Sequence, residues 1–262
     1  MKSFNFKSAT NTKEAAKLAS GRATFLAGGM SLLPAMKLGL AAYSDLINIK
    51  KIKGLSSIKV SSKSLRIGST TTHATVASSK EVGKSIPSLA VLAEGIGDPQ
   101  VRNRGTIGGS IANNDPAADY PSACLALNAV IHTNKRKIPA DKFFKGIFET
   151  DLKKGELIES IEFEVPEKSS YSKFPNPASR YAVVGVYVAK FKKDVRVAIT
   201  GASNSGVFRS KELESALSTN FSSSAIDNVN ISSNGFNADI HASAEYRAHI
   251  IRVMTKKAVS SC

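Results

Sequence analysis

The sequence has no tryptophan, only two cysteines and four histidines, and no apolar run long enough to span a bilayer among its 262 residues. Cys124 and Cys262 lie far apart without a CxxC pair, which excludes a thiolate-ligated iron–sulfur cluster or a cysteine-rich zinc site within this chain. The histidines form no HExxH motif, so we expect core or surface positions for them and predict no metal site. The N-terminal segment carries no apolar signal sequence, so we predict a cytoplasmic protein without an integral membrane segment.

Acidic residues are also scarce, because 36 lysines and arginines stand against 21 aspartates and glutamates and give a net charge of +15. Residues 1–70 hold twelve basic residues but only Glu14 and Asp45, so this segment alone carries +10. A basic segment suits nucleic acid, an anionic cofactor or an acidic partner. The run Lys50–Lys53, "KKIK", lacks interleaved aromatic residues, so we interpret it as a solvated surface and predict no nucleic-acid binding.

Short apolar segments alternate with turn residues and predict a chain of mixed strands and helices. Alternating or continuous apolar runs predict strands at residues 4–6, 23–29, 44–49, 64–69, 158–166, 181–191 and 195–203. Helix start signals, among them a capping box of Asn11 and Glu14, predict helices at residues 13–19, 87–96, 121–130, 210–218 and 242–259. The last helix is expected to bury one apolar stripe, formed by Tyr246, Ile250, Val253 and Met254.

Residues 166–179, "PEKSSYSKFPNPAS", form the most loop-like segment of the chain, and the composition changes there. We therefore predict a domain boundary within this segment. The Ser- and Asn-rich residues 218–235 are expected to form a loop or a weak helix.

Two glycine-rich segments carry the chemistry: residues 26–39, "LAGGMSLLPAMKLG", and residues 106–119, "TIGGSIANNDPAAD". Each is predicted as a strand, then Gly-Gly, then a small hydroxyl residue. Glycine lets successive backbone N–H groups turn toward an anion, and Ser31, Thr106 and Ser110 add hydroxyl groups. A tight turn or bulge is the simpler interpretation of one such pair. Two matching pairs favour a cradle for a diphosphate, although neither matches GxGxxG or a P-loop.

The chain resembles a known family over nearly its whole length. Residues 27–40, 96–127, 171–190 and 239–259 are similar to the FAD-binding medium subunits of aerobic carbon-monoxide-dehydrogenase-type molybdenum hydroxylases, of the xanthine-dehydrogenase family. The resemblance implies an α+β fold. Residues 1–168 would form a two-lobed FAD-binding domain of the vanillyl-alcohol-oxidase (PCMH) type, with lobes of about 1–53 and 54–168. Residues 169–262 would form a small α+β C-terminal domain of the carbon-monoxide-dehydrogenase type.

The same resemblance implies which residues contact FAD, in two diphosphate loops, at two further polar positions and at one apolar position near the flavin ring. These residues are Ala27, Gly28, Gly29, Met30, Ser31, Thr106, Ile107, Gly108, Gly109, Ser110, Asn113, Asp119 and Leu157.

Several of these positions have a second interpretation. Helix caps or Asx turns also explain Asn113 and Asp119, and an ordinary core strand explains Leu157, or Ile158 in its place. For Lys173, both an approach to the flavin and a solvated side chain are open. No sequence signal places a histidine or cysteine beside the flavin, so we expect non-covalent FAD.

The resemblance further implies the flavoprotein subunit of a multi-subunit oxidoreductase. FAD would take electrons from the [2Fe-2S] clusters of a small partner subunit and pass them to an external acceptor. The clusters and the molybdenum cofactor would lie on the small and large partner subunits, in a dimer of heterotrimers. This chain shows no acid–base pair, so we predict no catalytic residue in it. The alternatives are a stand-alone FAD oxidoreductase of the same fold and a basic nucleic-acid-binding protein.

Overall fold

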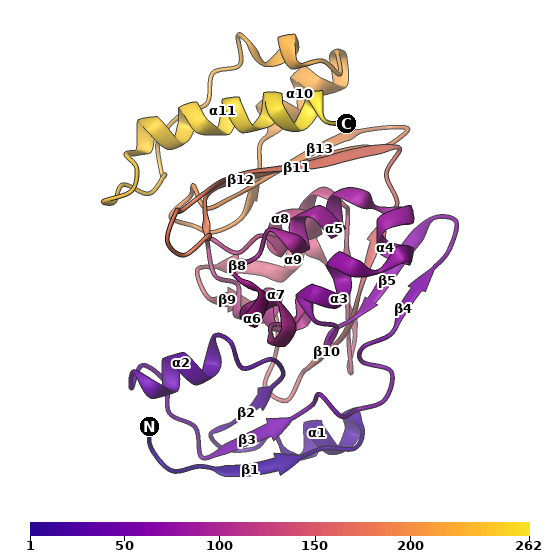
Figure 1. The fold of residues 1–262 in the computed structure, drawn as a ribbon, viewed down its shortest axis with the longest axis vertical. Helices are drawn as coiled ribbons and strands as arrows, with labels where there is room; N and C mark the ends of the chain where they lie inside the picture. The colour runs from indigo at the N-terminus through magenta and orange to yellow at the C-terminus, as the bar shows by residue number, and fades with distance from the viewer.

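The computed structural model describes residues 1–262, and Figure 1 shows three units one above the other. The N-terminal unit is a parallel sheet in the order β1 (Asn5–Ser8), β3 (Asp45–Asn48), β2 (Ala23–Leu26). Its strands are parallel because α1 (Thr12–Leu18) and α2 (Leu32–Lys37) connect them. We call this unit the first lobe.

The capping box before α1 is confirmed in a variant form. The Asn11 side chain accepts the N–H of Glu14 at 2.9 Å. The Glu14 carboxylate reaches back to the N–H of Thr10, at 2.8 Å, rather than to that of Asn11. Both bonds fix the start of the helix that crosses from β1 to β2.

The middle unit, the second lobe, is built on an antiparallel sheet in the order β4 (Ile58–Val60), β5 (Ser64–Gly68), β10 (Ile158–Glu164), β6 (Val130–Thr133), β7 (Lys137–Pro139). One sheet face, with Leu65 and Phe163, joins a core of 28 buried residues. The helices that contribute to this lobe are α3 (His73–Ser78), α4 (Lys80–Ser85), α5 (Pro87–Glu94), α6 (Pro99–Arg104), α7 (Ile107–Asn113), α8 (Tyr120–Ala126) and α9 (Ala140–Phe143). A hairpin of β8 (Phe144–Gly146) and β9 (Glu149–Thr150) follows α9.

The C-terminal unit is a sheet in the order β11 (Lys168–Pro175), β12 (Ala182–Lys190), β13 (Val195–Thr200), β14 (Phe208–Arg209). It is covered by α10 (Lys211–Thr219), the 3₁₀ helix η1 (Ser223–Ile226) and α11 (Ala244–Ser260), as Figure 1 shows. Strand β12 is buried on both faces: Val186 packs with these helices, whereas Tyr187 packs into the core of the second lobe. This two-sided burial explains the nearly continuous apolar run at 181–191.

Two expectations from the sequence are wrong here. Residues 166–179 are not a loop throughout, because residues 168–175 form β11, which pairs with β12 along its length, and only residues 166–167 and 176–179 are irregular or turn. In α11, Ile250 and Met254 are buried as expected, but Tyr246 and Val253 are 43% and 38% exposed. Arg247 takes the inner position instead, where its guanidinium donates to the Val183 carbonyl at 2.6 Å. No helix of the structure is both long and apolar enough to cross a membrane.

Candidate functional site

A cavity of about 900 Å³ lies where the two lobes meet the start of β12. Its wall combines residues from the ranges 24–49, 69–119, 148–158 and 179–181. Ile107 is not on the wall, because it is fully buried in the core of the second lobe. The other twelve residues that the sequence predicts at FAD all line this cavity: Ala27, Gly28, Gly29, Met30, Ser31, Thr106, Gly108, Gly109, Ser110, Asn113, Asp119 and Leu157.

The first glycine segment presents unused backbone donors to the cavity. The N–H groups of residues 27–32 have no backbone acceptor within the protein. Gly29 has a φ of +78°, which turns the chain after β2 and which few other residues adopt. Ser31 begins α2 without a capping hydrogen bond from its side chain. Unused N–H groups on successive residues of a cavity wall are of the kind that can bind an anion.

The second glycine segment differs from its prediction, because no strand precedes it and its glycines lie in the first turn of α7. Its N–H groups are already used: Ile107 donates to Thr71 at 3.1 Å, Gly108 to Ser69 at 2.8 Å and Ser110 to Thr106 at 2.9 Å, each to a carbonyl. The Gly109 N–H donates to the Thr106 hydroxyl at 3.1 Å. This segment therefore offers the cavity side chains and open space rather than a second nest of N–H groups.

The two segments lie against one another. A Cβ on Gly28 would stand 2.1 Å from the Arg104 carbonyl oxygen and 2.9 Å from Gly105 Cα, so only glycine lets the first lobe approach the α6–α7 connection. A Cβ on Gly108 would stand 2.6 Å from the Ser69 carbonyl oxygen. The glycines thus bring both segments to one cavity wall.

Unpaired polar atoms lie behind the second segment. The Ser69 hydroxyl and His73 Nδ1 are buried without a hydrogen-bond partner, and both residues line the cavity. Burial, with the charge of Arg102 nearby, lowers the pKa of His73 to about 4, so its imidazole is neutral at neutral pH. His73 is buried, as expected of a core histidine, and it also lines the cavity, which no sequence signal indicated.

Helix capping does not explain Asn113 or Asp119. Asp119 makes no side-chain cap at α8, and at the end of α7 the left-handed residue is Asn114, with a φ of 44°. Asp115 makes the local turn, accepting the Ala117 N–H at 2.9 Å. Asp119 instead contacts Tyr171 and Lys173 from β11. The interpretation of Lys173 as a solvated side chain is also wrong, because it is 10% exposed.

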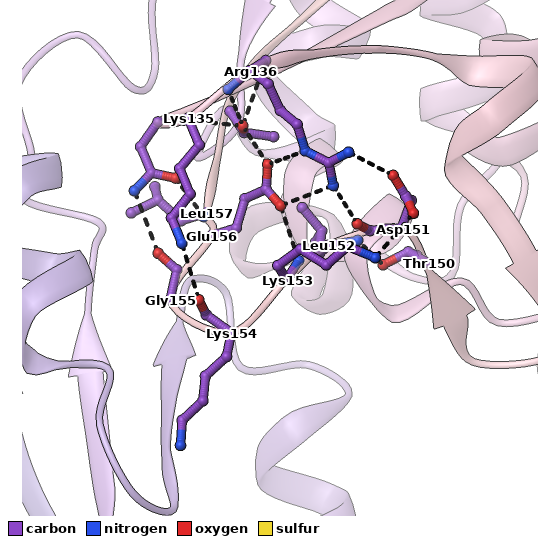
Figure 2. Close-up of polar contacts among 12 residues, drawn as sticks. Lys135, Arg136, Thr150, Asp151, Leu152, Lys153, Lys154, Gly155, Glu156 and Leu157 are labelled. Atoms are coloured by element: carbon purple, nitrogen blue, oxygen red, sulfur yellow. Dashed lines mark hydrogen bonds and ion pairs between the residues drawn. The ribbon is translucent and has the colours of Figure 1, made fainter.

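Leu157 reaches the wall from a loop that a buried carboxylate fixes (Figure 2). Glu156 accepts hydrogen bonds from the Thr133 hydroxyl at 2.7 Å and from Arg136 Nε at 3.0 Å. The Lys153 N–H donates to the same carboxylate at 2.9 Å. Leu157 is both a core residue and a wall residue, so its two interpretations are compatible. Nothing in the sequence pattern had pointed to Glu156.

Two residues at the cavity have unusual backbone conformations, and no sequence signal indicated either of them. Phe148 and Arg180 have φ values of +55° and +61°, a region that side chains other than glycine seldom adopt. Phe148 is 60% exposed, and its N–H donates to the Asn114 carbonyl at 3.0 Å. Tyr181 follows Arg180 and is 45% exposed on the same wall. Such strain is common beside binding sites.

Taken together, the wall has free backbone donors, unpaired hydroxyl groups and apolar stretches. This combination fits a large ligand that carries phosphates and an aromatic ring system, such as FAD. Residues 2–167 match the family model described as "FAD binding domain in molybdopterin dehydrogenase". The chain belongs to this family.

Members of the family are similar to this chain over almost its whole length. The glyceraldehyde dehydrogenase medium chain of Sulfolobus acidocaldarius is 34% identical, covering 97% of this chain and 96% of the relative. The nicotine 6-hydroxylase medium subunit of Paenarthrobacter nicotinovorans is 32% identical, covering 89% and 87%. A structure of carbon monoxide dehydrogenase from Hydrogenophaga pseudoflava superposes with a TM-score of 0.88 at 31% identity, covering 99% and 96%. This chain is thus an FAD-binding medium subunit of a multi-subunit molybdenum hydroxylase.

Proposed function

We propose that the cavity binds one FAD non-covalently and that the first glycine segment holds its diphosphate. The free N–H groups of residues 27–32 support this assignment. Ser110 and Asn113 would add polar side chains from α7, with Asp119 and Leu157 contacting the flavin end. Ile107 would act only by packing α7 against the core. The lobes 1–53 and 54–168 would hold the cofactor between them, and domain 169–262 would close one side.

Bound FAD would supply redox chemistry, because it exchanges electrons one or two at a time. The chain's own residues would bind and orient the flavin and shield it from water. We propose that electrons enter from [2Fe-2S] clusters of a small subunit and leave to an external acceptor. With only Cys124 and Cys262, this chain has too few thiolates to hold such clusters. A large subunit would carry the molybdenum cofactor.

We also propose that the complex assembles as a dimer of heterotrimers and lies in the cytoplasm. The substrate belongs to the large subunit, and the similarities do not select one. Relatives named for glyceraldehyde, nicotine and carbon monoxide show identities of 34%, 32% and 31%.

This proposal rests mainly on the unused N–H groups of residues 27–32, which lie on the wall of a cavity of about 900 Å³ that has both polar and apolar lining residues.

The test is spectroscopic. The purified chain should show a flavin spectrum that dithionite bleaches, but no turnover with carbon monoxide, purines or aldehydes. Adding the cluster-bearing and molybdenum-bearing subunits should restore flavin reduction by substrate. Turnover by the single chain, with metals verified absent, would instead support the stand-alone oxidoreductase.

A further inference from the structure

A lysine of the C-terminal domain lies behind the cavity wall without lining it. Lys173 Nζ lies 3.0 Å from Asp119 Oδ1, 2.7 Å from the Gly95 carbonyl oxygen and 3.1 Å from the Arg180 carbonyl oxygen. An ammonium group has three N–H donors, so this group is fully used. A charged group buried to this extent, with every donor occupied, is held in one place.

The three acceptors belong to three separate segments of the wall. Asp119 lines the cavity directly. Gly95 begins a turn whose next residues, Ile96 and Gly97, line it as well. Arg180 lines it together with Tyr181. One ammonium group therefore joins three parts of the wall: the residue that precedes α8, the α5–α6 connection and the segment before β12.

The register of β11 explains why this lysine points to the wall. Tyr171 and Lys173 are two residues apart and so lie on one face of the strand, toward the second lobe. A Cβ on Gly185 of β12 would stand 2.4 Å from the Tyr171 hydroxyl, so the glycine leaves room for Tyr171 to reach Asp119. Tyr171 and Lys173 both contact Asp119 Oδ1. Oδ2 is left without a side-chain partner.

The charge of Lys173 also matters for Asp119. Burial raises the pKa of Asp119, and the charge of Lys173 is the strongest influence that lowers it again. The other titratable groups near this carboxyl are neutral tyrosines whose pKa values burial raises, and the acid Asp115 beside one of them: Tyr120, Tyr171, Tyr181 and Asp115. Arg180 lies on the same wall, but its guanidinium donates to the Gly97 carbonyl at 3.2 Å.

We propose that Lys173 is a positioning residue for the flavin cofactor, which fixes the Asp119 carboxylate and joins it to the two neighbouring wall segments. The C-terminal domain then contributes to FAD affinity through a side chain that does not itself reach the cavity. This inference rests on the proposed function, because it concerns the affinity of the same cavity for FAD.

The test compares Lys173→Met with Lys168→Met, which makes the same change at an exposed position of the same strand. Apoprotein is titrated with FAD, followed by flavin fluorescence, at a series of pH values. Lys173→Met should raise the Kd for FAD about tenfold or more, as expected when a charged hydrogen bond is lost. Its Kd should also begin to rise toward acid at a higher pH than in the wild type, because Asp119 no longer has a cation beside it.

A double variant, Asp119→Asn with Lys173→Met, protects the test against misfolding, because it leaves no unpaired buried charge. The double variant should bind FAD weakly, and its Kd should not show the rise toward acid that is expected for Lys173→Met. Circular dichroism checks that it folds. The inference is overturned if Lys173→Met matches Lys168→Met within about twofold at every pH. It is also overturned if Lys173→Met does not fold and the folded double variant binds FAD as the wild type does. Failure of the wild type itself to bind FAD would contradict the proposed function instead.

Discussion

At the scale of single residues, the glycines around the cavity differ in what a side chain at each position would contact. A Cβ on Gly28 or Gly108 would meet backbone atoms of the neighbouring segment, which cannot easily move away. A Cβ on Gly109 would meet only the Thr106 hydroxyl, at 2.8 Å, and otherwise point into open cavity. Gly28 and Gly108 therefore serve the fold, whereas Gly109 leaves space for a ligand.

This difference predicts opposite outcomes for two substitutions. Gly109→Val should lose FAD while keeping a melting temperature close to that of the wild type, because its side chain enters the cavity. Gly108→Val should unfold at a clearly lower temperature, because its side chain collides with Ser69. Bound FAD per chain and thermal unfolding, measured on both variants, check this. Full flavin occupancy in Gly109→Val would show that the ligand does not approach α7.

A substitution at Ser110 should weaken FAD binding less than one at Gly109. Its hydroxyl lies on the cavity, and Ser110→Ala removes one hydrogen bond to a neutral or charged ligand group. The loss of FAD binding free energy should be about 0.5–3 kcal/mol. Calorimetric titration of apoprotein with FAD measures it. An unchanged Kd would mean that this hydroxyl does not contact the cofactor.

At the scale of elements, the turn between β6 and β7 determines where the loop at 151–157 lies (Figure 2). Arg136 binds both the Glu156 carboxylate and Asp151, at 3.0 Å and 2.8 Å. Burial raises the pKa of Glu156, but hydrogen bonds from Arg136 and from the Lys153 N–H outweigh it and hold this pKa below its usual range. The carboxylate thus stabilises the fold above its unfolded-state pKa, and this contribution is lost as the pH falls through its folded-state pKa.

We therefore expect Arg136→Met to lower the free energy of unfolding at neutral pH, because it leaves the buried Glu156 carboxylate without its cation. Its stability should also fall less between neutral and acid pH than that of the wild type, because without Arg136 the folded-state pKa of Glu156 lies closer to its unfolded-state value. Urea unfolding at neutral and acid pH measures both effects. Lys153→Met is the matched control, because its ion pair with Asp151 is exposed and should contribute less to stability. Equal stability of the two variants would contradict this role.

The elements also show which parts of the fold the sequence could predict. Strands with dense apolar runs, such as β12 and β13, and helices with clear start signals, such as α5, were predicted correctly. Strand β11 was missed because its Ser, Lys and Pro residues resemble a loop, while its strand form depends on pairing with β12. The strand before the second glycine segment was wrong because Thr106 caps a helix there.

In the candidate site too, local sequence patterns could be predicted, whereas features that depend on tertiary contacts could not. Local motifs identified both glycine segments, and the family resemblance supplied Asp119 and Leu157. His73, Glu156 and Phe148 come to the cavity through tertiary contacts that leave no local pattern. Whether an N–H group is free or already bonded also depends on the fold, so the sequence could not distinguish the nest at 27–32 from the occupied donors at 107–110.

At the scale of the whole molecule, the cavity lies between units and holds one histidine, His73, on its wall. Because that imidazole is buried against Gly105, we expect FAD to bind without a covalent bond to it. Acid precipitation of the holoprotein should release all flavin colour into the supernatant. Flavin that stays with the pellet after washing would indicate a covalent link and contradict this expectation.

The central claim is that FAD binds between the lobes with its diphosphate on the first glycine segment. Hydrogen–deuterium exchange on the apoprotein and holoprotein tests it most directly, because the N–H groups of residues 27–32 have no acceptor until the ligand provides one. We expect FAD to slow exchange strongly at residues 27–32 and to change it little at residues 107–110, whose N–H groups are already bonded. Tight FAD binding with no new protection at residues 27–32 would contradict it.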